Sequence, residues 1–321
     1  MKFHISNSAF IGNIDPFIAA FDPRDPSVLE VTTHDKWLSA HPVVLAMIAA
    51  KGLKVAPRHI SFDRINARSG HYLERMKLFE MLNVKSGIHI AESDPSGRFI
   101  PLSQVKTPQE QTNFITEMMP ILHLEPYHAE AIRYVVSELI RNVIEHSGSE
   151  NGAVVAAQYH KKSNMIRIGI ADTGIGIKKS INRSHKAWTD MDALKLALTP
   201  GITGTTQREG GTAENAGAGL FIIKSIAVNN RDFFMLYSGN ALYKLLKRKP
   251  NARTVLYADP SRDNHSEKEG LPFWQGTVVG IDISLEAAGE FRALLDLIGD
   301  IYNTAIKDRK KLRHKKVRFE Q

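Results

Sequence analysis

The chain contains no cysteine in its 321 residues. This absence excludes disulfide bonds, thiolate metal sites and cysteine nucleophiles. Its thirteen histidines include no pair at the H-x-x-x-H or H-E-x-x-H spacing, so the sequence does not predict a zinc site on a helix. Any chemistry must therefore come from other residue types.

Long apolar runs are also missing. The longest, residues 42–50, is far too short to cross a bilayer, and the first residues lack the form of a signal peptide. We therefore expect a cytoplasmic protein with no membrane partner. The composition, 43% hydrophobic and 24% charged, allows a sizeable core and two ordinary domains.

Two common nucleotide-binding motifs are absent as well. The chain has neither G-x-G-x-x-G nor G-x-x-x-x-G-K-[ST], so the sequence predicts neither a dinucleotide-binding βαβ unit nor a P-loop. Residues suited to nucleotide chemistry instead occur in three separated segments.

The first segment, residues 129–147, has apolar residues at helical spacing and predicts an amphipathic helix. Glu138 and Asn142 lie four residues apart and Glu145 three further on, so all three share one stripe. An amide oxygen is a ligand that magnesium accepts, and a carboxylate one turn away can take a proton from water or an alcohol. We expect Asn142 to hold magnesium and Glu138 to be the base. Alone, this spacing is more typical of a solvated helix face.

The second segment begins with residues 165–171, whose β-branched side chains predict a buried strand. Asp172 follows this strand, and Gly174 and Gly176 permit a tight turn with close backbone approach to a flat ligand. The Asp172 carboxylate is then free to accept a hydrogen bond from an exocyclic amine, such as that of adenine. In isolation, D-x-G-x-G is more often a plain turn.

The third segment, residues 209–219, is rich in glycine and leads into an apolar helix that starts at Leu220. Backbone N–H groups at Gly217 and Gly219, together with the positive end of the helix dipole, favour bound phosphate. A bare glycine loop is the alternative interpretation.

Together, the three segments resemble the N, G1 and G2 boxes of the GHKL superfamily, which unites gyrase, heat-shock chaperone, histidine kinase and MutL-type ATPases. Residues 275–283 resemble a later element of these proteins, in which the position of Thr277 lies near adenine and phosphates. The resemblance implies ATP and Mg²⁺ as cofactors. It also implies an α/β sandwich with a mixed sheet on one side and helices on the other.

The same resemblance implies that residues 178–216 form an ATP lid. Thr203, Gly204 and Thr205 have hydroxyls and small side chains suited to phosphate contacts, although a plain turn is equally consistent with them. Lys178, Lys179 and Arg208 are weaker candidates for neutralising the triphosphate.

The N-terminal region, residues 1–103, predicts a small regulatory α/β domain because strands and helices alternate along it. Its strand and helix order weakly resembles a STAS domain. Ser39 lies where that family carries a phosphorylatable serine, but the surrounding residues depart from the family pattern. Turn residues near 93–97 and an N-cap threonine before a proline at 107–108 place the start of the ATP-binding domain, residues 104–286, close to this point.

A C-terminal helix and basic tail, residues 287–321, complete the chain. The formal charge of the whole chain is +8, and residues 307–321 contain eight basic and two acidic residues, a net charge of +6. Such a tail binds nucleic acid or an acidic partner, or is simply the solvated end of a helix.

Two classes of function agree with these patterns. One is a regulatory ATPase or a serine/threonine-type kinase in a signalling or stress and defence system, with a protein partner or a second copy of the chain. The other is a non-catalytic switch in which ATP orders the lid and so controls a protein or nucleic-acid partner. The sequence leaves the choice between hydrolysis and protein phosphorylation open.

Overall fold

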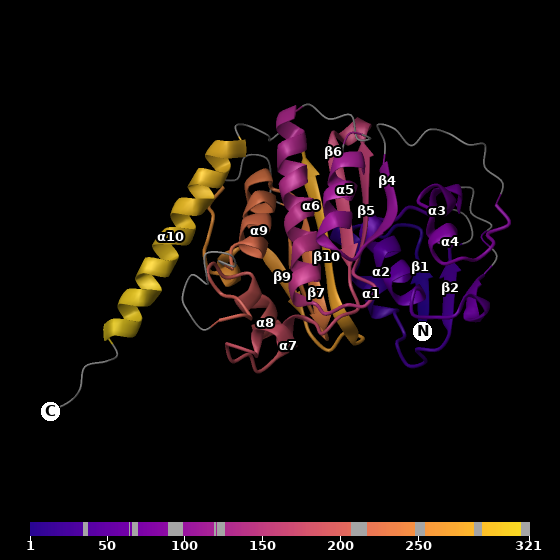
Figure 1. Ribbon diagram of the computed structural model, residues 1–321, viewed down its shortest axis with the longest axis horizontal. Helices are drawn as coiled ribbons and strands as arrows, with labels where there is room; N and C mark the ends of the chain where they lie inside the picture. Colours follow the sequence, from indigo (N-terminus) through magenta and orange to yellow (C-terminus); the bar gives the residue numbers. More distant parts are fainter. Residues whose placement is uncertain are drawn as a thin grey trace.

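The computed structural model describes residues 1–34, 38–63, 65, 70–88, 99–118, 120, 126–206, 217–247, 254–285 and 291–315. A large antiparallel sheet carries a layer of helices on one face, and the N-terminal region covers part of the other face (Figure 1). This arrangement confirms the predicted α/β class with a small N-terminal unit beside a larger sheet.

The larger sheet has seven strands in the order β4-β5-β6-β10-β7-β8-β9. They are β4 (Phe99–Val105), β5 (Ala153–His160), β6 (Met165–Ala171), β7 (Phe234–Gly239), β8 (Ala241–Leu245), β9 (His265–Lys268) and β10 (Trp274–Ser284). Every neighbouring pair is antiparallel, whereas the family resemblance implies a mixed sheet. The reason is connectivity, since β5–β6 and β7–β8 follow each other directly and β10 returns between β6 and β7 against both.

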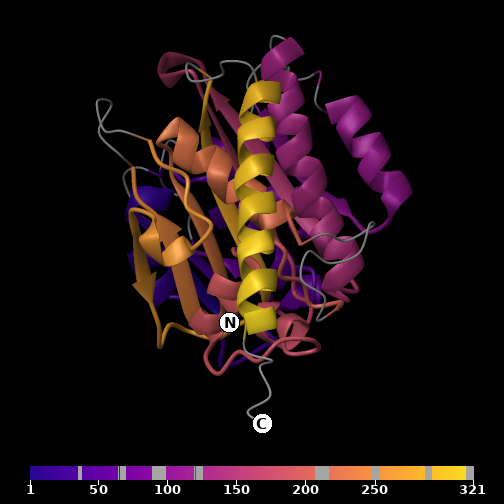
Figure 2. The same cartoon turned by 90° about the vertical axis from the view of Figure 1, so that its left-hand side faces the viewer.

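Six helices are described on the first face of the larger sheet and beside it: α5 (Pro108–Met118), α6 (Pro126–His146), α7 (Ile177–Ile181), α8 (Asp190–Ala197), α9 (Gly219–Asn230) and α10 (Phe291–Lys315). The apolar stripe of α6 is buried against the sheet, as its helical spacing predicts. Helix α10 packs on α9 and α6, where the Phe291 and Tyr134 rings lie 6.1 Å apart (Figure 2).

The N-terminal unit has a parallel sheet of three strands, β1 (Lys2–Ile5), β2 (Leu29–Thr33) and β3 (Ile60–Phe62), in sequence order. Its helices are α1 (Asp15–Ala19), α2 (Pro42–Gly52), α3 (His71–Arg75) and α4 (Leu78–Met81). Between α3 and α4 the backbone breaks at Lys77, which adopts a left-handed conformation with φ of 58°. The likeness of this unit to a STAS domain stays a prediction.

Helix α2 joins the two units. All eleven of its residues are buried, and it packs on β5, β6 and β10 of the larger sheet. Its first turn lies directly on Gly169 of β6, where a Cβ atom would come within 2.1 Å of the Val43 nitrogen. The two units therefore share one hydrophobic core across this face of the sheet.

The first predicted domain boundary falls inside strand β4. This strand pairs with β5, so it belongs to the larger sheet, and the boundary between residues 103 and 104 falls within it. The division into three domains stays a prediction. None of the helices within the described part of the chain is both long and apolar enough to cross a bilayer.

Candidate functional site

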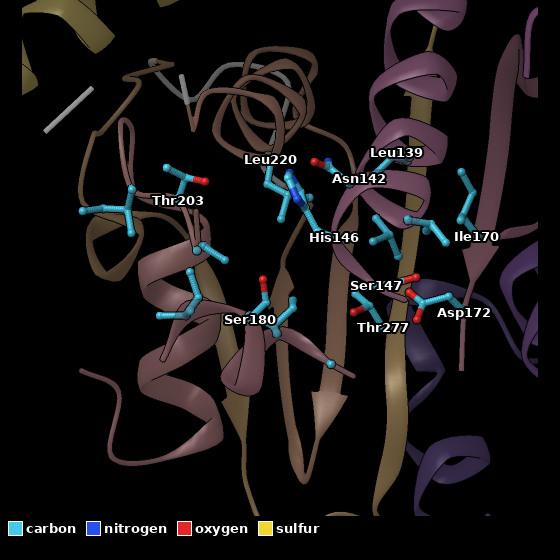
Figure 3. A pocket seen from close by; sticks show the side chains of 18 residues that line it. Leu139, Asn142, His146, Ser147, Ile170, Asp172, Ser180, Thr203, Leu220 and Thr277 are labelled. Carbon is cyan, nitrogen blue, oxygen red and sulfur yellow. The ribbon is translucent and has the colours of Figure 1, made fainter. Parts of the chain in front are cut away.

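A cavity lies between the helical layer and the larger sheet, and part of it is open to solvent. The space inside it that is open to water-sized molecules is about 120 Å³. Figure 3 shows Asp172, Thr277 and Ser147 close together in one part of the cavity and Thr203 in another. The lining residues are Leu139, Asn142, Val143, His146, Ser147, Ile170, Asp172, Gly176, Ile177, Ser180, Ile181, Ala197, Ile202, Thr203, Gly204, Leu220, Thr277 and Val279.

Asp172 directly follows the last residue of β6 and is only 2% exposed. Its backbone is held by the central strand, because its N–H donates to the Thr277 carbonyl at 2.9 Å and its carbonyl accepts from the Trp274 indole at 3.1 Å. Burial raises the pKa of the Asp172 carboxyl to about 7, against hydrogen bonds from Gly174 and Thr277 and the charge of Lys51. The group is poised to accept a hydrogen bond inside the cavity.

The turn after Asp172 is tied to the end of α6. The Gly174 N–H donates to the Asp172 carboxylate at 2.7 Å, and the Ile175 N–H donates to the Ser147 carbonyl at 2.7 Å. Gly176 then precedes α7 with a φ of 79°, a conformation that favours glycine. These bonds keep one wall of the cavity in a defined position.

Glu138 lies one turn before Asn142 on α6 but does not line the cavity itself. Its side chain is 13% exposed and accepts from the Arg141 guanidinium at 2.9 Å. Burial raises the pKa of the Glu138 carboxyl, and the nearby Arg141 charge opposes this rise. A carboxylate whose pKa is raised is a stronger base.

The start of α9 lies against this carboxylate. A Cβ atom at Gly219 would come within 2.5 Å of the Glu138 Oε2 atom, so the absence of a side chain at Gly219 allows the two segments to meet. The last residue of the third glycine segment, Gly219, therefore lies beside the predicted base. Leu220, the next residue of α9, lines the cavity.

The Asn142 side-chain amide is suited to binding a ligand. Its Nδ2 atom is buried and has no hydrogen-bond partner within the described residues. Because the oxygen and nitrogen of an amide exchange places by a simple flip, the same side chain can present an oxygen to a cation. No group of three or more acidic or histidine side chains suited to a metal occurs in the described ranges, so a magnesium ion here would take its remaining ligands from phosphate and water.

The loop at residues 200–206 forms the far wall of the cavity. Thr203 and Gly204 line it, whereas Thr205 instead hydrogen-bonds to the Thr203 hydroxyl. The Gly201 N–H donates to the Gly217 carbonyl at 3.0 Å, which joins this loop to the glycine segment. Helix α10 also holds the loop, since the Arg309 guanidinium donates to the Pro200 carbonyl.

Seven of the twelve predicted site residues line the cavity: Asn142, Asp172, Gly176, Thr203, Gly204, Leu220 and Thr277. The other five, Glu138, Gly174, Thr205, Gly217 and Gly219, do not line it but lie in the segments around it. Lys178 and Lys179 lie on α7 without lining the cavity, and Arg208 falls outside the described residues.

Three polar lining residues were missed by the sequence predictions: His146, Ser147 and Ser180. His146 carried a signal, because it follows Asn142 by four residues on the same helix stripe. Ser147 and Ser180 carried none, since serine near a helix end is common for structural reasons.

The comparisons with known proteins agree with this geometry. Residues 106–229 match the family model of the histidine kinase-like ATPase domain. The matched segment contains α5 to α9 with β5 and β6, so Asp172, Asn142 and the glycine segment fall inside it and Thr277 falls outside. No curated protein matches the chain.

Proposed function

We propose that the chain binds ATP with magnesium and transfers the terminal phosphoryl group, because residues 106–229 match a histidine kinase-like ATPase domain. At the family level, the domain supports an ATP-binding regulatory ATPase or kinase. The proposal rests on the meeting of three separated segments at one cavity. Asn142 from α6, Asp172 after β6 and Thr277 from β10 line the same cavity although far apart in sequence.

The adenine would occupy the part of the cavity beside Asp172. There the carboxylate accepts from the exocyclic amine, and Thr277 and Ser147 offer further hydrogen bonds nearby (Figure 3). Apolar side chains such as Ile170 and Val279 line the same cavity and exclude water from the faces of the base.

The phosphates would extend toward the start of α9 and the loop that carries Thr203. Backbone N–H groups at a helix start favour phosphate oxygens. Asn142 would hold the magnesium ion, which neutralises phosphate charge when bound. Because Gly219 lies against Glu138, the reacting phosphoryl group would be close to this carboxylate.

Glu138 acts as the general base in this proposal. It takes the proton of water or of an acceptor hydroxyl while that oxygen bonds to the terminal phosphorus, and the bond from phosphorus to the ADP oxygen breaks. Burial raises the pKa of Glu138, which strengthens it as a base, and Arg141 holds its orientation. Water as acceptor gives hydrolysis, whereas a serine or threonine hydroxyl gives a protein kinase.

A conformational switch is the second candidate function, and the contact of α10 with the loop at residues 200–206 favours it. Arg309 donates to the Pro200 carbonyl, and Ile306 is buried on Gly201 in the loop that continues to Thr203. Nucleotide bound beside this loop would therefore change how α10 and the basic residues 307–321 are presented to a partner. Nucleic acid as that partner stays a prediction.

Incubation with ATP labelled on the terminal phosphate tests the proposal. The wild-type protein should bind ATP with magnesium and release labelled phosphate or label a protein acceptor. Asp172→Asn should bind ATP at least about a hundredfold more weakly by calorimetry, because the carboxylate must accept from both the Gly174 N–H and the adenine amine, and an amide has only one accepting atom. Glu138→Gln should bind ATP normally but lose about a hundredfold or more in turnover.

Glu145→Gln is the matched control. Glu145 lies on the same stripe of α6 but is 42% exposed, so its loss should leave turnover nearly unchanged. Equal turnover by Glu138→Gln and the wild type would exclude Glu138 as the base. Absence of ATP binding by the wild type would reject the whole proposal.

A further inference from the structure

Lys51 is a buried cation on the face of the sheet opposite the cavity. It lies near the end of α2, in the N-terminal unit, and is 7% exposed. The ATP-binding segment of the family match does not include it, since that match begins at residue 106. Lys51 therefore offers a physical link between the N-terminal unit and the proposed nucleotide site.

The contacts of Lys51 lead directly to the turn that carries Asp172. The Lys51 Nζ atom lies 4.2 Å from the centre of the Trp274 ring and 3.5 Å from the Gln275 carbonyl oxygen. The indole N–H of Trp274 donates to the Asp172 carbonyl at 3.1 Å, and the Gln275 amide donates to the Gly174 carbonyl. Lys51 thus packs on the two residues that hold this turn.

Lys51 also lacks the partner that buried cations usually have. Within the described part of the chain no carboxylate forms an ion pair with it, whereas Lys224 lies 2.6 Å from Asp263 and Lys244 pairs with Asp15. A buried ammonium without a close counter-ion is costly and calls for an explanation. A buried acid lies beyond Trp274, since the Trp274 indole donates to the backbone carbonyl of Asp172, and the Lys51 and Asp172 charges act on each other.

We propose that Lys51 is a positioning residue that keeps Asp172 ionised for adenine binding and so makes nucleotide affinity depend on the docked N-terminal unit. The inference rests on the proposed function, because it assumes that Asp172 accepts from the base. It extends that function by assigning to helix α2 a role in nucleotide binding.

The charges around the pair support this assignment. Burial raises the pKa of Asp172 to about 7, and the Lys51 charge acts against this rise. Burial and the nearby Lys54 lower the pKa of Lys51 to about 8, while Asp172 acts to raise it. His146 also lines the cavity, and burial lowers its pKa below the usual 6.5.

These pKa shifts determine how ATP affinity should change with pH. Asp172 loses its charge as the pH falls through about 7, so ATP affinity should fall with it. Without the Lys51 charge the Asp172 pKa rises further, and the loss of affinity begins at a higher pH. At a pH well above both values Asp172 is ionised either way, so the variant and the wild type should bind alike.

The test is calorimetry of ATP binding to the full chain between about pH 6 and pH 9, with Lys51→Met and Lys51→Arg. Methionine keeps an unbranched apolar stem on Trp274, and arginine keeps the charge. Lys51→Met should bind ATP about fivefold more weakly at pH 7 and close to tenfold more weakly at pH 6, as a rise of about one unit in the Asp172 pKa requires, and should recover near pH 9. Lys51→Arg should keep the wild-type profile.

Lys54→Gln is the matched control, since Lys54 is an exposed cation close to Lys51 and should not weaken binding when removed. A purely structural role for Lys51 would lower affinity equally at every pH, and that result would overturn the inference. So would an unchanged affinity of Lys51→Met at all pH values. Failure of the wild-type protein to bind ATP at any pH would instead reject the proposed function.

Discussion

The two faces of the seven-stranded sheet use buried polar groups in different ways. On the cavity face, the Asp172 side chain and the Nδ2 atom of Asn142 are buried with bonding capacity left for a ligand. On the opposite face, α2 packs so closely that β6 carries a glycine at the contact. The comparison shows that one sheet can support a binding site on one side because the other side is closed by the N-terminal unit.

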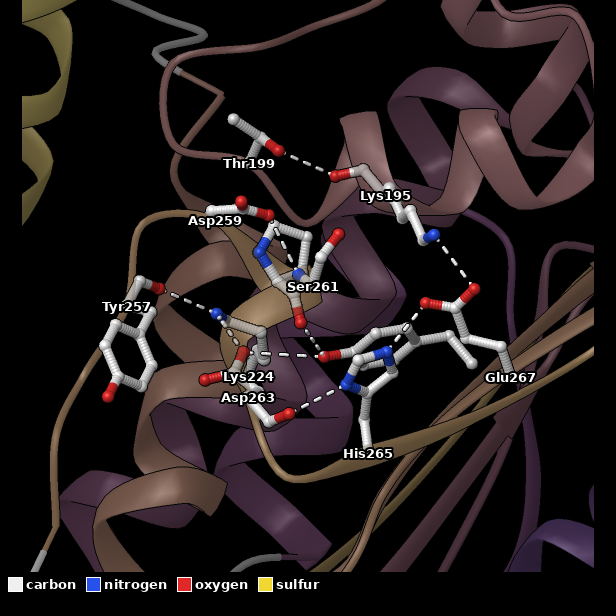
Figure 4. A network of polar contacts seen from close by, with 11 residues as sticks. Lys195, Thr199, Lys224, Tyr257, Asp259, Ser261, Asp263, His265 and Glu267 are labelled. Atoms are coloured by element: carbon white, nitrogen blue, oxygen red, sulfur yellow. Dashed lines mark hydrogen bonds and ion pairs between the residues drawn. The ribbon is translucent and has the colours of Figure 1, made fainter.

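Two buried lysines, one on each side of the sheet, differ in how their charge is satisfied. Lys224 of α9 is 1% exposed and donates to Asp263 at 2.6 Å and to the Tyr257 carbonyl at 2.9 Å, within the polar network of Figure 4. Lys51 has only an aromatic ring and a carbonyl as close partners in the described residues. Lys224 is thus explained by local stability, whereas Lys51 requires a longer-range role.

The largest expected effect comes from removing the Lys224 charge. Lys224→Met leaves the Asp263 carboxylate buried beside an apolar side chain, so the free energy of unfolding should fall by about 3 to 5 kcal/mol in urea denaturation. Lys195→Met is the control, because its ion pair with Glu267 is partly exposed and should contribute less than about 1 kcal/mol. Similar losses in both variants would remove the distinction between the two kinds of lysine.

Two glycine substitutions, one on each face of the sheet, should affect different properties of the protein. Gly169→Ala places a Cβ against the α2 backbone and should destabilise the fold by about 3 kcal/mol, because neither backbone segment can move aside easily. Gly219→Ala comes too close only to the movable end of Glu138, while the Asn142 Nδ2 atom stays at an ordinary contact distance of 3.5 Å, so stability should change by less than about 0.5 kcal/mol. It should instead reduce ATP turnover by about a hundredfold, since a small displacement of the base suffices.

Denaturation and turnover assays on the same two proteins make this check. If Gly219→Ala keeps full turnover, the start of α9 does not position Glu138. If Gly169→Ala is as stable as the wild type, the docking of α2 on β6 is looser than the structure shows.

The smallest expected effect concerns His41, which caps α2 against the sheet. Its Nδ1 atom accepts from the Val43 N–H at 3.0 Å, so Nε2 carries the proton and donates to Asp282 at 3.0 Å. His41→Asn keeps a capping side chain but cannot reach Asp282, and should lower the free energy of unfolding by about 1 kcal/mol. His41→Ala removes both contacts and should cost about 2 kcal/mol.

The same residue predicts a dependence of stability on pH. Burial lowers the pKa of His41 below its usual 6.5, despite Asp282, and the charge of Arg167 acts in the same direction. The unfolded chain therefore binds a proton that the folded chain resists, and stability present above pH 6.5 is lost as the pH falls below it. Urea denaturation at several pH values should show a weaker dependence in His41→Ala, and an equal dependence would contradict the assignment.

Much of the candidate site was predictable because its residues follow short-range rules. Asp172 ends a β-branched run, Asn142 lies one turn beyond Glu138 on an apolar-striped helix, and the glycine segment opens the next helix. Such patterns depend on spacing within a single element. The cavity lining by Ser147 and Ser180 was not predictable, because it depends on which loops meet above the sheet.

The amino-acid sequence by itself determined the elements and the chemistry of the pocket: the helix of Glu138 and Asn142, the strand before Asp172 and the glycines before Leu220. Only the tertiary structure decided that α2 would close the back of the sheet and bring Lys51 behind Asp172, 121 positions away in the sequence. The physical reason is that local periodicity specifies which side of an element is apolar. It does not specify which distant apolar surface that side will be buried against.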